Sequence, residues 1–249
     1  MGLLRSLLLW FTIAFMTAVY FPIDLIGYFL FWDRTHHWGH KYARFWAKSI
    51  IRMNPAWDIA MDVSRLPAGR HFVIASNHES TADIIVDLHL PHHFKFISKR
   101  QNFLVPFMGW AMTLAHYIPL VRGSRESIER CMAKARWFVD NGVSVLFYPE
   151  GTRSPDGEVR PFKPGAFRLA IESGVDVLPV ATVGTRSLIE KNSVRFASGT
   201  MHLIVGDPIP VAGLTLDDVP LLAERTRQAI VALKGEIERP AVAELRKAS

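Results

Sequence analysis

The sequence predicts an α/β protein: a largely parallel or mixed central sheet flanked by helices, with an N-terminal helical hairpin that associates with a membrane. Three observations lead to this prediction. Short apolar runs alternate with helical patterns over most of the chain, residues 7–32 are almost unbroken apolar sequence, and a basic amphipathic segment follows them. Strands that alternate with helices are typical of α/β domains whose sheet is mainly parallel.

The first segment is long enough to cross a membrane as a helix. A span needs roughly 20 apolar residues, and the run from Leu7 to Trp32 exceeds this length. Pro22 and Asp24 interrupt the run, and a proline kinks or ends a helix. A helical hairpin that dips into one leaflet is therefore the alternative to a simple span. No Ala-x-Ala cleavage signal follows, so we expect the segment to stay attached as an anchor.

The stretch that follows, residues 33–53, has the pattern of a helix lying in the headgroup layer. A cationic stripe and a mainly aromatic stripe recur along it at helical spacing. Their members are Lys41, Arg44, Lys48 and Arg52 on the first, and Trp38, Tyr42, Phe45, Ile50 and Met53 on the second. This combination is typical of helices on anionic membrane surfaces. The alternative is an ordinary amphipathic helix packed on the core.

The rest of the chain alternates short apolar runs with helical stretches. Predicted strands cover residues 71–76, 94–98, 117–123, 143–149, 177–182 and 199–210; predicted helices begin near residue 81 and cover residues 124–141, 164–173 and 219–238. We therefore divide the chain into membrane-anchoring helices, residues 1–55, and an α/β domain, residues 56–249. In parallel sheets, functional groups collect in the loops after the carboxyl ends of the strands.

Composition limits the partners and the compartment. The chain has 249 residues and a formal net charge of +6, which suits nucleic acid, an anionic membrane face or a phosphorylated substrate. The only cysteine, Cys131, excludes a disulfide framework and indicates a reducing compartment. Because it lies among apolar residues of a predicted helix, we expect a packed core thiol.

The first loop of interest contains the sequence SNHESTAD. Positions five apart point about 140° from each other within one helix, so His78 and Asp83 meet only if the helix begins near Ser80 and His78 folds back over its first turn. Asp83 then orients the imidazole and leaves its other nitrogen as a proton acceptor. A helix capping box formed by Ser80 and Asp83 is the alternative. Since the chain lacks a Gly-x-Ser-x-Gly nucleophile motif, the histidine would activate a substrate hydroxyl.

The second loop, FYPEGTRSPDGEVRPFKPG, is rich in turn-forming residues. Gly151 permits close approach of the backbone, and Thr152 offers a hydroxyl. The planar guanidinium of Arg153 suits the oxygens of a phosphate. An ion pair between Glu150 and Arg153 that holds the loop shut is the alternative, and it is compatible with phosphate binding because Glu150 could position the arginine.

These loops carry a resemblance to a known family. NHESTAD matches the Asn-His-x4-Asp motif and FYPEGTRS the Phe-Pro-Glu-Gly-Thr-Arg motif of the glycerolipid acyltransferases. SKRQNFLVPFMGWAM and HYIPLVRG resemble the family's second block, and VLPVA its fourth. The four blocks occur in the family's order between Phe72 and Val183. The chain resembles the 1-acyl-sn-glycerol-3-phosphate (lysophosphatidic acid) acyltransferases.

The resemblance implies roles for particular residues. His78 is implied as the general base and Asp83 as its orienting partner. The residues implied at the substrate site, chiefly around the acceptor's phosphate, are Asn77, Lys99, Arg122, Glu150, Gly151, Thr152 and Arg153. His116 stands where relatives often carry glycine, which we expect to change the shape of that loop.

The implied reaction moves a fatty acyl group from an acyl thioester to the sn-2 hydroxyl of lysophosphatidic acid, giving phosphatidic acid. His78 takes the hydroxyl proton and a thiol leaves, so neither an acyl-enzyme nor a cofactor is expected. The donor is acyl-CoA or acyl carrier protein. Glycerol 3-phosphate or another lysolipid is the alternative acceptor. The expected location is a phospholipid membrane, with the catalytic domain on its cytoplasmic face.

Two hypotheses of other classes compete. The triplets His36, His37, His40 and His89, His92, His93 suggest a metal-dependent hydrolase, but they lack the carboxylate or cysteine company of a zinc site, and we expect no metal. A non-catalytic protein that binds anionic lipids accounts for the charge and the anchor, but not for the polar residues expected at one sheet edge. We expect no nucleic acid partner, since basic residues concentrate near the membrane segment and the two loops.

Overall fold

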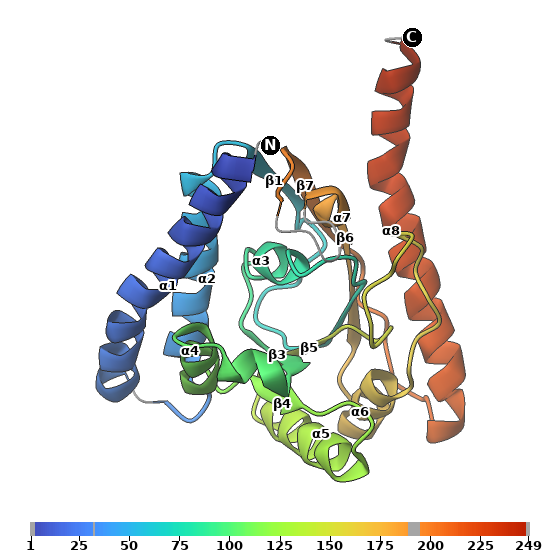
Figure 1. Ribbon diagram of the computed structural model, residues 1–249. Helices are drawn as coiled ribbons and strands as arrows, with labels where there is room; N and C mark the ends of the chain where they lie inside the picture. The colour runs from blue at the N-terminus through green and yellow to red at the C-terminus, as the bar shows by residue number, and fades with distance from the viewer. Residues whose placement is uncertain (1–2, 32, 189–194, 248–249) are drawn as a thin grey trace.

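Strands and helices alternate along most of the chain (Figure 1). The structure is a computed structural model, and it describes residues 3–31, 33–188 and 195–247. The strands are β1 (Trp57–Asp62), β2 (Val73–Ser76), β3 (Phe94–Lys99), β4 (Ile118–Leu120), β5 (Ser144–Phe147), β6 (Val177–Val183) and β7 (Gly199–Val205). The helices are α1 (Leu3–Leu30), α2 (His37–Met53), α3 (Asp83–Asp87), α4 (Met108–Leu114), α5 (Arg125–Asp140), α6 (Gly165–Ser173), α7 (Thr185–Leu188) and α8 (Val219–Lys247), with 3-10 turns η1 (Arg100–Leu104) and η2 (Leu216–Asp218).

In the described part of the chain, seven strands form one sheet in the order β1-β7-β6-β2-β5-β3-β4. β6, β2, β5, β3 and β4 run parallel to one another. β7 is antiparallel to β6, and β1 is parallel to β7. The predicted mixed sheet flanked by helices is confirmed. Because five neighbouring strands point the same way, the loops after their carboxyl ends lie at one edge of the sheet.

Buried apolar side chains form two clusters, one on each face of the sheet. One cluster lies beneath α2 and α3 and includes Ile50 and Val86. The other lies beneath α5, α6 and α8 and includes Phe167 and Ile230. Cys131 is buried in this second cluster, as the sequence predicted, and burial raises the pKa of its thiol to about 11. A thiol in this state is a poor nucleophile.

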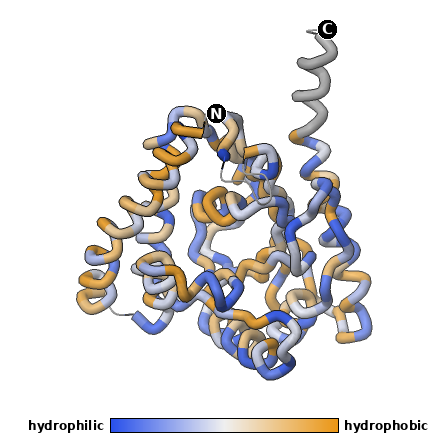
Figure 2. Tube along the Cα trace, in the orientation of Figure 1, coloured by the Kyte–Doolittle hydropathy of each residue, from blue (hydrophilic) through white to orange (hydrophobic). Residues whose placement is uncertain are grey.

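The N-terminal segment is one long helix, α1, and the expectation that Pro22 breaks it is wrong. The helix runs from Leu3 to Leu30 with Pro22 inside it. A proline removes one backbone hydrogen bond, and long apolar helices tolerate that loss. By length and composition α1 could cross a membrane: an 18-residue window has a mean hydropathy of 1.8, and only 17% of it is buried. Figure 2 shows this apolar character along α1.

α2 packs between α1 and the sheet, so the two N-terminal helices form a hairpin beside the domain (Figure 1). The Trp46 indole donates to the Thr17 hydroxyl at 3.1 Å, and Ala47 belongs to the core cluster under α2. Lys41 and Lys48 are exposed, as expected for a cationic stripe. Phe45, which the sequence placed mainly with the aromatic residues, is 57% exposed on this cationic side, because it lies four residues from Lys41 and three from Lys48.

Most predicted elements of the body are present, and several short ones were missed: β1, α4, α7 and the two 3-10 turns. β1 pairs with β7 and lies at the edge of the sheet, so four of its six residues are exposed and the apolar run that marks a strand is absent. α4 lies within a family block in which no helix was predicted. The expected division near residue 55 falls between α2 and β1; it stays a prediction.

Candidate active site

The carboxyl edge of the five parallel strands carries the candidate site. The loop after β2 holds His78, and the loop after β5 holds Arg153. Lys99 ends β3, Arg122 follows β4, and Thr185 follows β6. The topology therefore brings together at one edge residues from five separate parts of the sequence.

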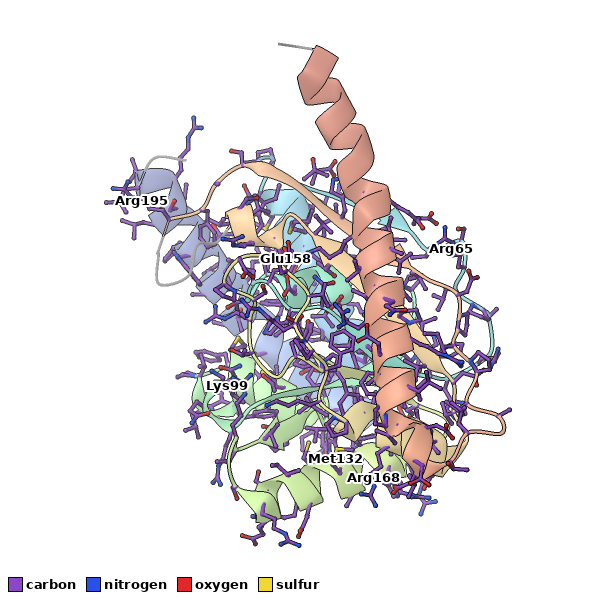
Figure 3. The ribbon with its side chains drawn as sticks, turned by 90° about the vertical axis from the view of Figure 1, so that its right-hand side faces the viewer. Arg65, Lys99, Met132, Glu158, Arg168 and Arg195 are labelled. Atoms are coloured by element: carbon purple, nitrogen blue, oxygen red, sulfur yellow. The ribbon has the colours of Figure 1, made fainter. Side chains whose placement is uncertain are left out.

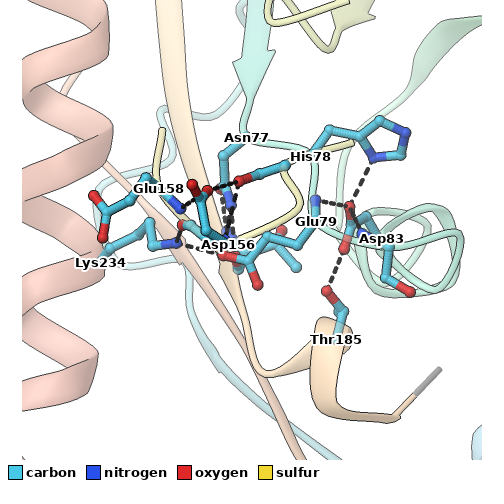
Figure 4. Close-up of polar contacts among 12 residues, drawn as sticks. Asn77, His78, Glu79, Asp83, Asp156, Glu158, Thr185 and Lys234 are labelled. Carbon is cyan, nitrogen blue, oxygen red and sulfur yellow. Dashed lines mark hydrogen bonds and ion pairs between the residues drawn. The ribbon is translucent and has the colours of Figure 1, made fainter. Parts of the chain in front are cut away.

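His78 and Asp83 meet as the sequence predicted. The His78 Nδ1 lies 2.7 Å from Asp83 Oδ2, and Asp83, the first residue of α3, is fully buried. The same Oδ2 accepts the backbone N–H groups of Glu79 at 2.7 Å and Ser80 at 2.9 Å, while Oδ1 accepts the Thr185 hydroxyl. Figure 4 shows the imidazole and Thr185 on opposite sides of this carboxylate. These four hydrogen bonds together restrain the Asp83 carboxylate in one orientation.

The capping-box alternative forms only in part. Asp83 accepts from the Ser80 N–H, which is one half of the motif. The Ser80 hydroxyl accepts from Ala82 N at 3.4 Å, and the N-cap residue of α3, Ala82, makes no side-chain cap. The carboxylate therefore caps the turn and orients the histidine at once, so the two readings of the sequence describe one arrangement.

The geometry fixes the tautomer of His78. A ring nitrogen beside a carboxylate that already accepts two N–H groups serves as a donor, so Nδ1 carries the proton and Nε2 is the acceptor. The His78 side chain is 13% exposed. No further polar partner of the ring is found within the described ranges, so Nε2 is available to a hydroxyl.

Tyr148 packs flat against His78, a contact that the sequence did not predict. The ring centroids lie 4.2 Å apart with an interplanar angle of 18°. The Tyr148 hydroxyl donates to Asp87 at 2.5 Å, and Asp87 also contacts the Thr182 hydroxyl at 3.3 Å. The pKa of Asp87 is raised to about 8, mainly because the carboxyl is buried. At neutral pH this carboxyl is mostly neutral, so it anchors Tyr148 without adding a second full negative charge beside Asp83.

The loops after β2 and β5 are joined through the backbone of His78. The buried Glu150 carboxylate accepts from His78 N at 2.9 Å and from Arg160 N at 3.2 Å. Ser154 N donates to His78 O at 2.7 Å. Burial raises the pKa of Glu150. Glu150, expected among the substrate-binding residues, thus holds the loop that carries His78 in place.

Arg153 does not pair with Glu150. Its Nη1 donates to the Thr81 hydroxyl at 3.1 Å, so the loop-closing ion pair considered from the sequence is not formed. Arg122 lies close to Arg153: the pKa of Arg122 is lowered by partial burial and, second, by the positive charge of Arg153. Neither guanidinium forms an ion pair with a carboxylate in the described part of the chain, and two such groups at one sheet edge suit an anion.

Gly151 occupies a turn that only glycine fits well. Its φ is 72°, in the left-handed region, and its N–H donates to Tyr148 O at 3.0 Å. A Cβ there would lie 2.6 Å from the Lys163 Nζ. Lys163 thus lies against the motif loop at Gly151, a contact that was not predicted from the sequence. Thr152 is exposed in the same loop.

Lys99 and Asn77 differ in their surroundings. Lys99 is exposed at the end of β3, at the margin of the molecule (Figure 3). Asn77 is buried, and its side chain bonds both the N–H and the C=O of Thr182 at 2.8 Å. The expectation that Asn77 contacts substrate is not supported by this position, because the amide is fully used in joining its loop to β6.

Helix α8 supports the site from the side opposite the hairpin. The Lys234 ammonium forms an ion pair with Glu79, next to His78, and donates to Gly157 O at 2.6 Å. Both side chains of the pair are at most 10% exposed. Figure 4 shows Lys234 reaching from α8 to the loop that carries Glu79. One lysine therefore ties the loop after β2 and the loop after β5 to a long helix.

The histidine clusters lie elsewhere and have other roles. The His40 ring bonds the Tyr117 hydroxyl and His92 O, and His37 contacts His93 with 3.0 Å between their Nδ1 atoms. Across the residues that the structure describes, no group of three or more histidine, cysteine, aspartate or glutamate side chains could hold a metal ion. These histidines join α2 to the domain.

Comparisons with known proteins identify the family of the chain. A family model described as Acyltransferase matches residues 59–183. A chloroplastic 1-acyl-sn-glycerol-3-phosphate acyltransferase of Brassica napus is 37% identical over 183 residues, which are 72% of this chain and 53% of that protein. The human 1-acyl-sn-glycerol-3-phosphate acyltransferase alpha is 34% identical, over 69% of this chain and 61% of that protein. The chain thus spans about half to three fifths of the length of these relatives.

A solved structure resembles nearly the whole chain. The crystal structure of the 1-acyl-sn-glycerophosphate (LPA) acyltransferase PlsC from Thermotoga maritima superposes with a TM-score of 0.76 at 28% sequence identity. The match covers 93% of this chain and 97% of that one. The N-terminal hairpin and the α/β domain therefore both lie largely within the shared fold.

Proposed function

Because the chain belongs to the acyltransferase family, whose model covers residues 59–183, we propose that it is a membrane-associated 1-acylglycerol-3-phosphate O-acyltransferase. It moves a fatty acyl group from an acyl thioester to the sn-2 hydroxyl of lysophosphatidic acid and so makes phosphatidic acid. One observation carries the proposal: an imidazole held by a buried carboxylate, at 2.7 Å, shares a sheet edge with two guanidinium groups that lack an acidic partner among the described residues.

His78 is the general base of the proposed reaction. Its Nδ1–H is fixed on Asp83, so Nε2 accepts the proton of the acceptor hydroxyl as the oxygen attacks the thioester carbonyl. The C–S bond then breaks, and the proton from Nε2 reaches the departing thiolate. General base assistance of this kind contributes roughly 10² to 10⁴ in rate. The contacts of Asp83 with Glu79 N, Ser80 N and Thr185 hold the base in position before substrate arrives.

Arg153 and Arg122 bind the acceptor's phosphate in the proposed complex. Planar guanidinium groups hold phosphate oxygens with two hydrogen bonds each. Holding the charged end fixes the direction in which the sn-2 hydroxyl points, and orientation of this kind can supply a large part of the rate. Lys99, at the end of β3, adds a third positive charge along the path by which the acceptor's phosphate enters. The donor thioester needs no activated protein nucleophile, which agrees with the absence of a serine elbow in the sequence.

The apolar helix α1 supports the proposal that the protein acts at a membrane, where the lysolipid acceptor is found. Many of its large apolar side chains are exposed; Leu4, Leu8, Phe11 and Phe29 are between 63% and 81% exposed. The exposed lysines of α2 match an anionic headgroup layer. We place the catalytic domain on the cytoplasmic face, where acyl-CoA or acyl carrier protein can deliver the acyl group.

A panel of acceptors tests this function directly. The full chain in phospholipid vesicles is given one acyl-CoA and, in turn, lysophosphatidic acid, glycerol 3-phosphate, lysophosphatidylcholine and monoacylglycerol, and the free thiol and the lipid product are measured. Fast thiol release with lysophosphatidic acid, together with phosphatidic acid as product, is the expected result. Preference for glycerol 3-phosphate or for an uncharged acceptor would reassign the substrate, and no thiol release with any acceptor would remove the acyltransferase proposal.

A further inference from the structure

The catalytic domain exposes an apolar surface of its own beside the hairpin. We call it the apolar segment: residues 100–110, which comprise η1 and the start of α4. It carries Leu104, 72% exposed, with Val105, Phe107 and Trp110 at 43%, 38% and 47%. Scattered apolar residues are normal on a protein surface, but several large ones in one short segment indicate an interaction site.

The apolar segment is continuous with α1. The ring of Phe21 in α1 lies 5.9 Å from the ring of Phe107 and 5.5 Å from that of Trp110, and these two rings are 5.1 Å apart. Leu25, four residues from Phe21 and therefore on the same face of α1, is itself 36% exposed. In Figure 2 the apolar colour passes from the lower half of α1 to the neighbouring η1 and α4 region. One apolar surface therefore spans the hairpin and the catalytic domain.

The backbone is strained where the segment turns. Phe107 has φ 59° and ψ −57°, and Met108 N donates to Pro106 O at 2.7 Å. A tight turn with these angles is rare and strained for a residue with a side chain. The strain sets the Phe107 ring against Phe21 and Trp110. Positive charges border the segment, since Lys99 and Arg100 at its start are both exposed.

We propose that the apolar segment is a second membrane-contacting element, which inserts Leu104, Phe107 and Trp110 into the leaflet that α1 occupies. Apolar and aromatic side chains rimmed by lysine and arginine are the chemistry that binds a phospholipid interface. The apolar segment is continuous with the apolar face of α1. One bilayer can cover both at once, which favours a membrane over a protein partner. The inference rests on the proposed membrane association of α1.

Insertion of the segment would determine how the acceptor reaches His78. Lys99 ends β3 and directly precedes the segment, so a segment inserted in the leaflet holds the Lys99 ammonium at the level of the headgroups. The lysolipid then enters sideways, with its phosphate meeting Lys99 first and its acyl chain still in the bilayer. The segment would therefore affect acceptors that reside in the membrane and spare short-chain acceptors dissolved in water.

Site-specific fluorescence tests the insertion. In a Cys131→Ser background, single cysteines replace Leu104, Leu8 of α1 or Leu216 of η2, and each carries an environment-sensitive fluorophore. Leu216 is the matched control, an apolar residue that is 47% exposed and precedes α8, away from the hairpin. The labelled full chain is reconstituted in vesicles of phosphatidylcholine and phosphatidylglycerol, with and without lipids brominated in the acyl chains.

We expect a blue shift and quenching by brominated lipid at positions 104 and 8, and neither change at 216. Quenching at 8 with a water-exposed signal at 104 overturns the second element and leaves the anchor intact, whereas loss of both signals removes the membrane association as well. A signal at 104 that responds to acyl carrier protein and not to brominated lipid assigns the surface to the donor and overturns the proposal. In addition, Leu104→Gln should raise KM about tenfold for long-chain acceptor in vesicles and leave turnover of a dissolved short-chain acceptor unchanged.

Discussion

Replacement of Asp83 by asparagine separates two things that this residue does for His78: it supplies a charge, and it holds the ring in one orientation. In the structure Oδ2 accepts three donors, His78 Nδ1, Glu79 N and Ser80 N, and Oδ1 accepts the Thr185 hydroxyl. The two backbone N–H groups cannot turn away. In Asp83→Asn they require the amide oxygen at the Oδ2 position, and the amide NH2 then faces Thr185, whose hydroxyl can rotate to accept.

The asparagine variant should therefore keep the tautomer and lose only the charge. A hydrogen bond to a charged group contributes about 1.5–3 kcal/mol, which corresponds to a kcat lower by about 10- to 150-fold. Asp83→Ala also loses the orientation and leaves buried donors without acceptors. Its kcat should fall further, up to the full value of about 10⁴ for base catalysis, with a stability cost of about 1–3 kcal/mol for each unsatisfied group.

Initial rates of thiol release at saturating donor and acceptor measure both variants, and thermal unfolding of the same preparations measures their folding. The reasoning requires the order wild type, then asparagine, then alanine. Equal losses in the two variants would show that the backbone donors do not fix the amide. A wild-type rate in Asp83→Asn would show that the carboxylate charge has no part in the reaction.

Three further changes test other parts of the site. Arg153→Ala should raise KM for lysophosphatidic acid about tenfold or more, through loss of a charged hydrogen bond, with the donor's KM unchanged; a shift in the donor's KM would place Arg153 at the thioester instead. Asp87→Asn should flatten the pH dependence of the free energy of unfolding. Burial raises the pKa of Asp87 from 3.8 in the unfolded chain to about 8 in the folded protein. As the pH rises between these values, the unfolded chain loses this proton and the folded chain keeps it, so the wild type becomes less stable. Denaturant unfolding across that range checks the sign, and identical slopes in the two proteins would contradict it. Gly151→Ala and Gly142→Ala meet similar backbone strain, at φ 72° and 77°, but only the former meets a neighbour, the Lys163 Nζ at 2.6 Å; both should lose about 1 kcal/mol or more of stability, and only Gly151→Ala should weaken acceptor binding in a KM measurement.

Much of the fold is predictable from the sequence because most strands of the sheet are buried on both faces. All four residues of β2 and of β5 are buried, so each strand reads as an apolar run. β1 has one partner strand and an exposed face, and its sequence, WDIAMD, carries no such run. The course of α1 through Pro22 was predicted wrongly because a single residue type was given more weight than the long apolar sequence around it.

The candidate site likewise contains residues that local sequence predicts and residues that only tertiary contacts reveal. His78 and Asp83 are five residues apart, so local geometry was enough to predict their contact. Tyr148 and Lys163 were missed because each acts through a tertiary contact, one on the His78 ring and the other over Gly151. Thr185 begins α7, just after β6, and lies 102 positions from Asp83. No spacing rule relates such residues, and only the order of strands in the sheet brings them together.

The most direct test of the central claim is the rate at which His78→Ala releases thiol from an acyl thioester in the presence of lysophosphatidic acid. The variant is compared with wild type in the same vesicles, after its folding and its membrane association have been shown to be unchanged. We predict that transfer falls to background, with a loss on the order of 10² to 10⁴. Turnover near the wild-type rate would contradict the claim that this imidazole, held by Asp83, takes the proton from the acceptor hydroxyl.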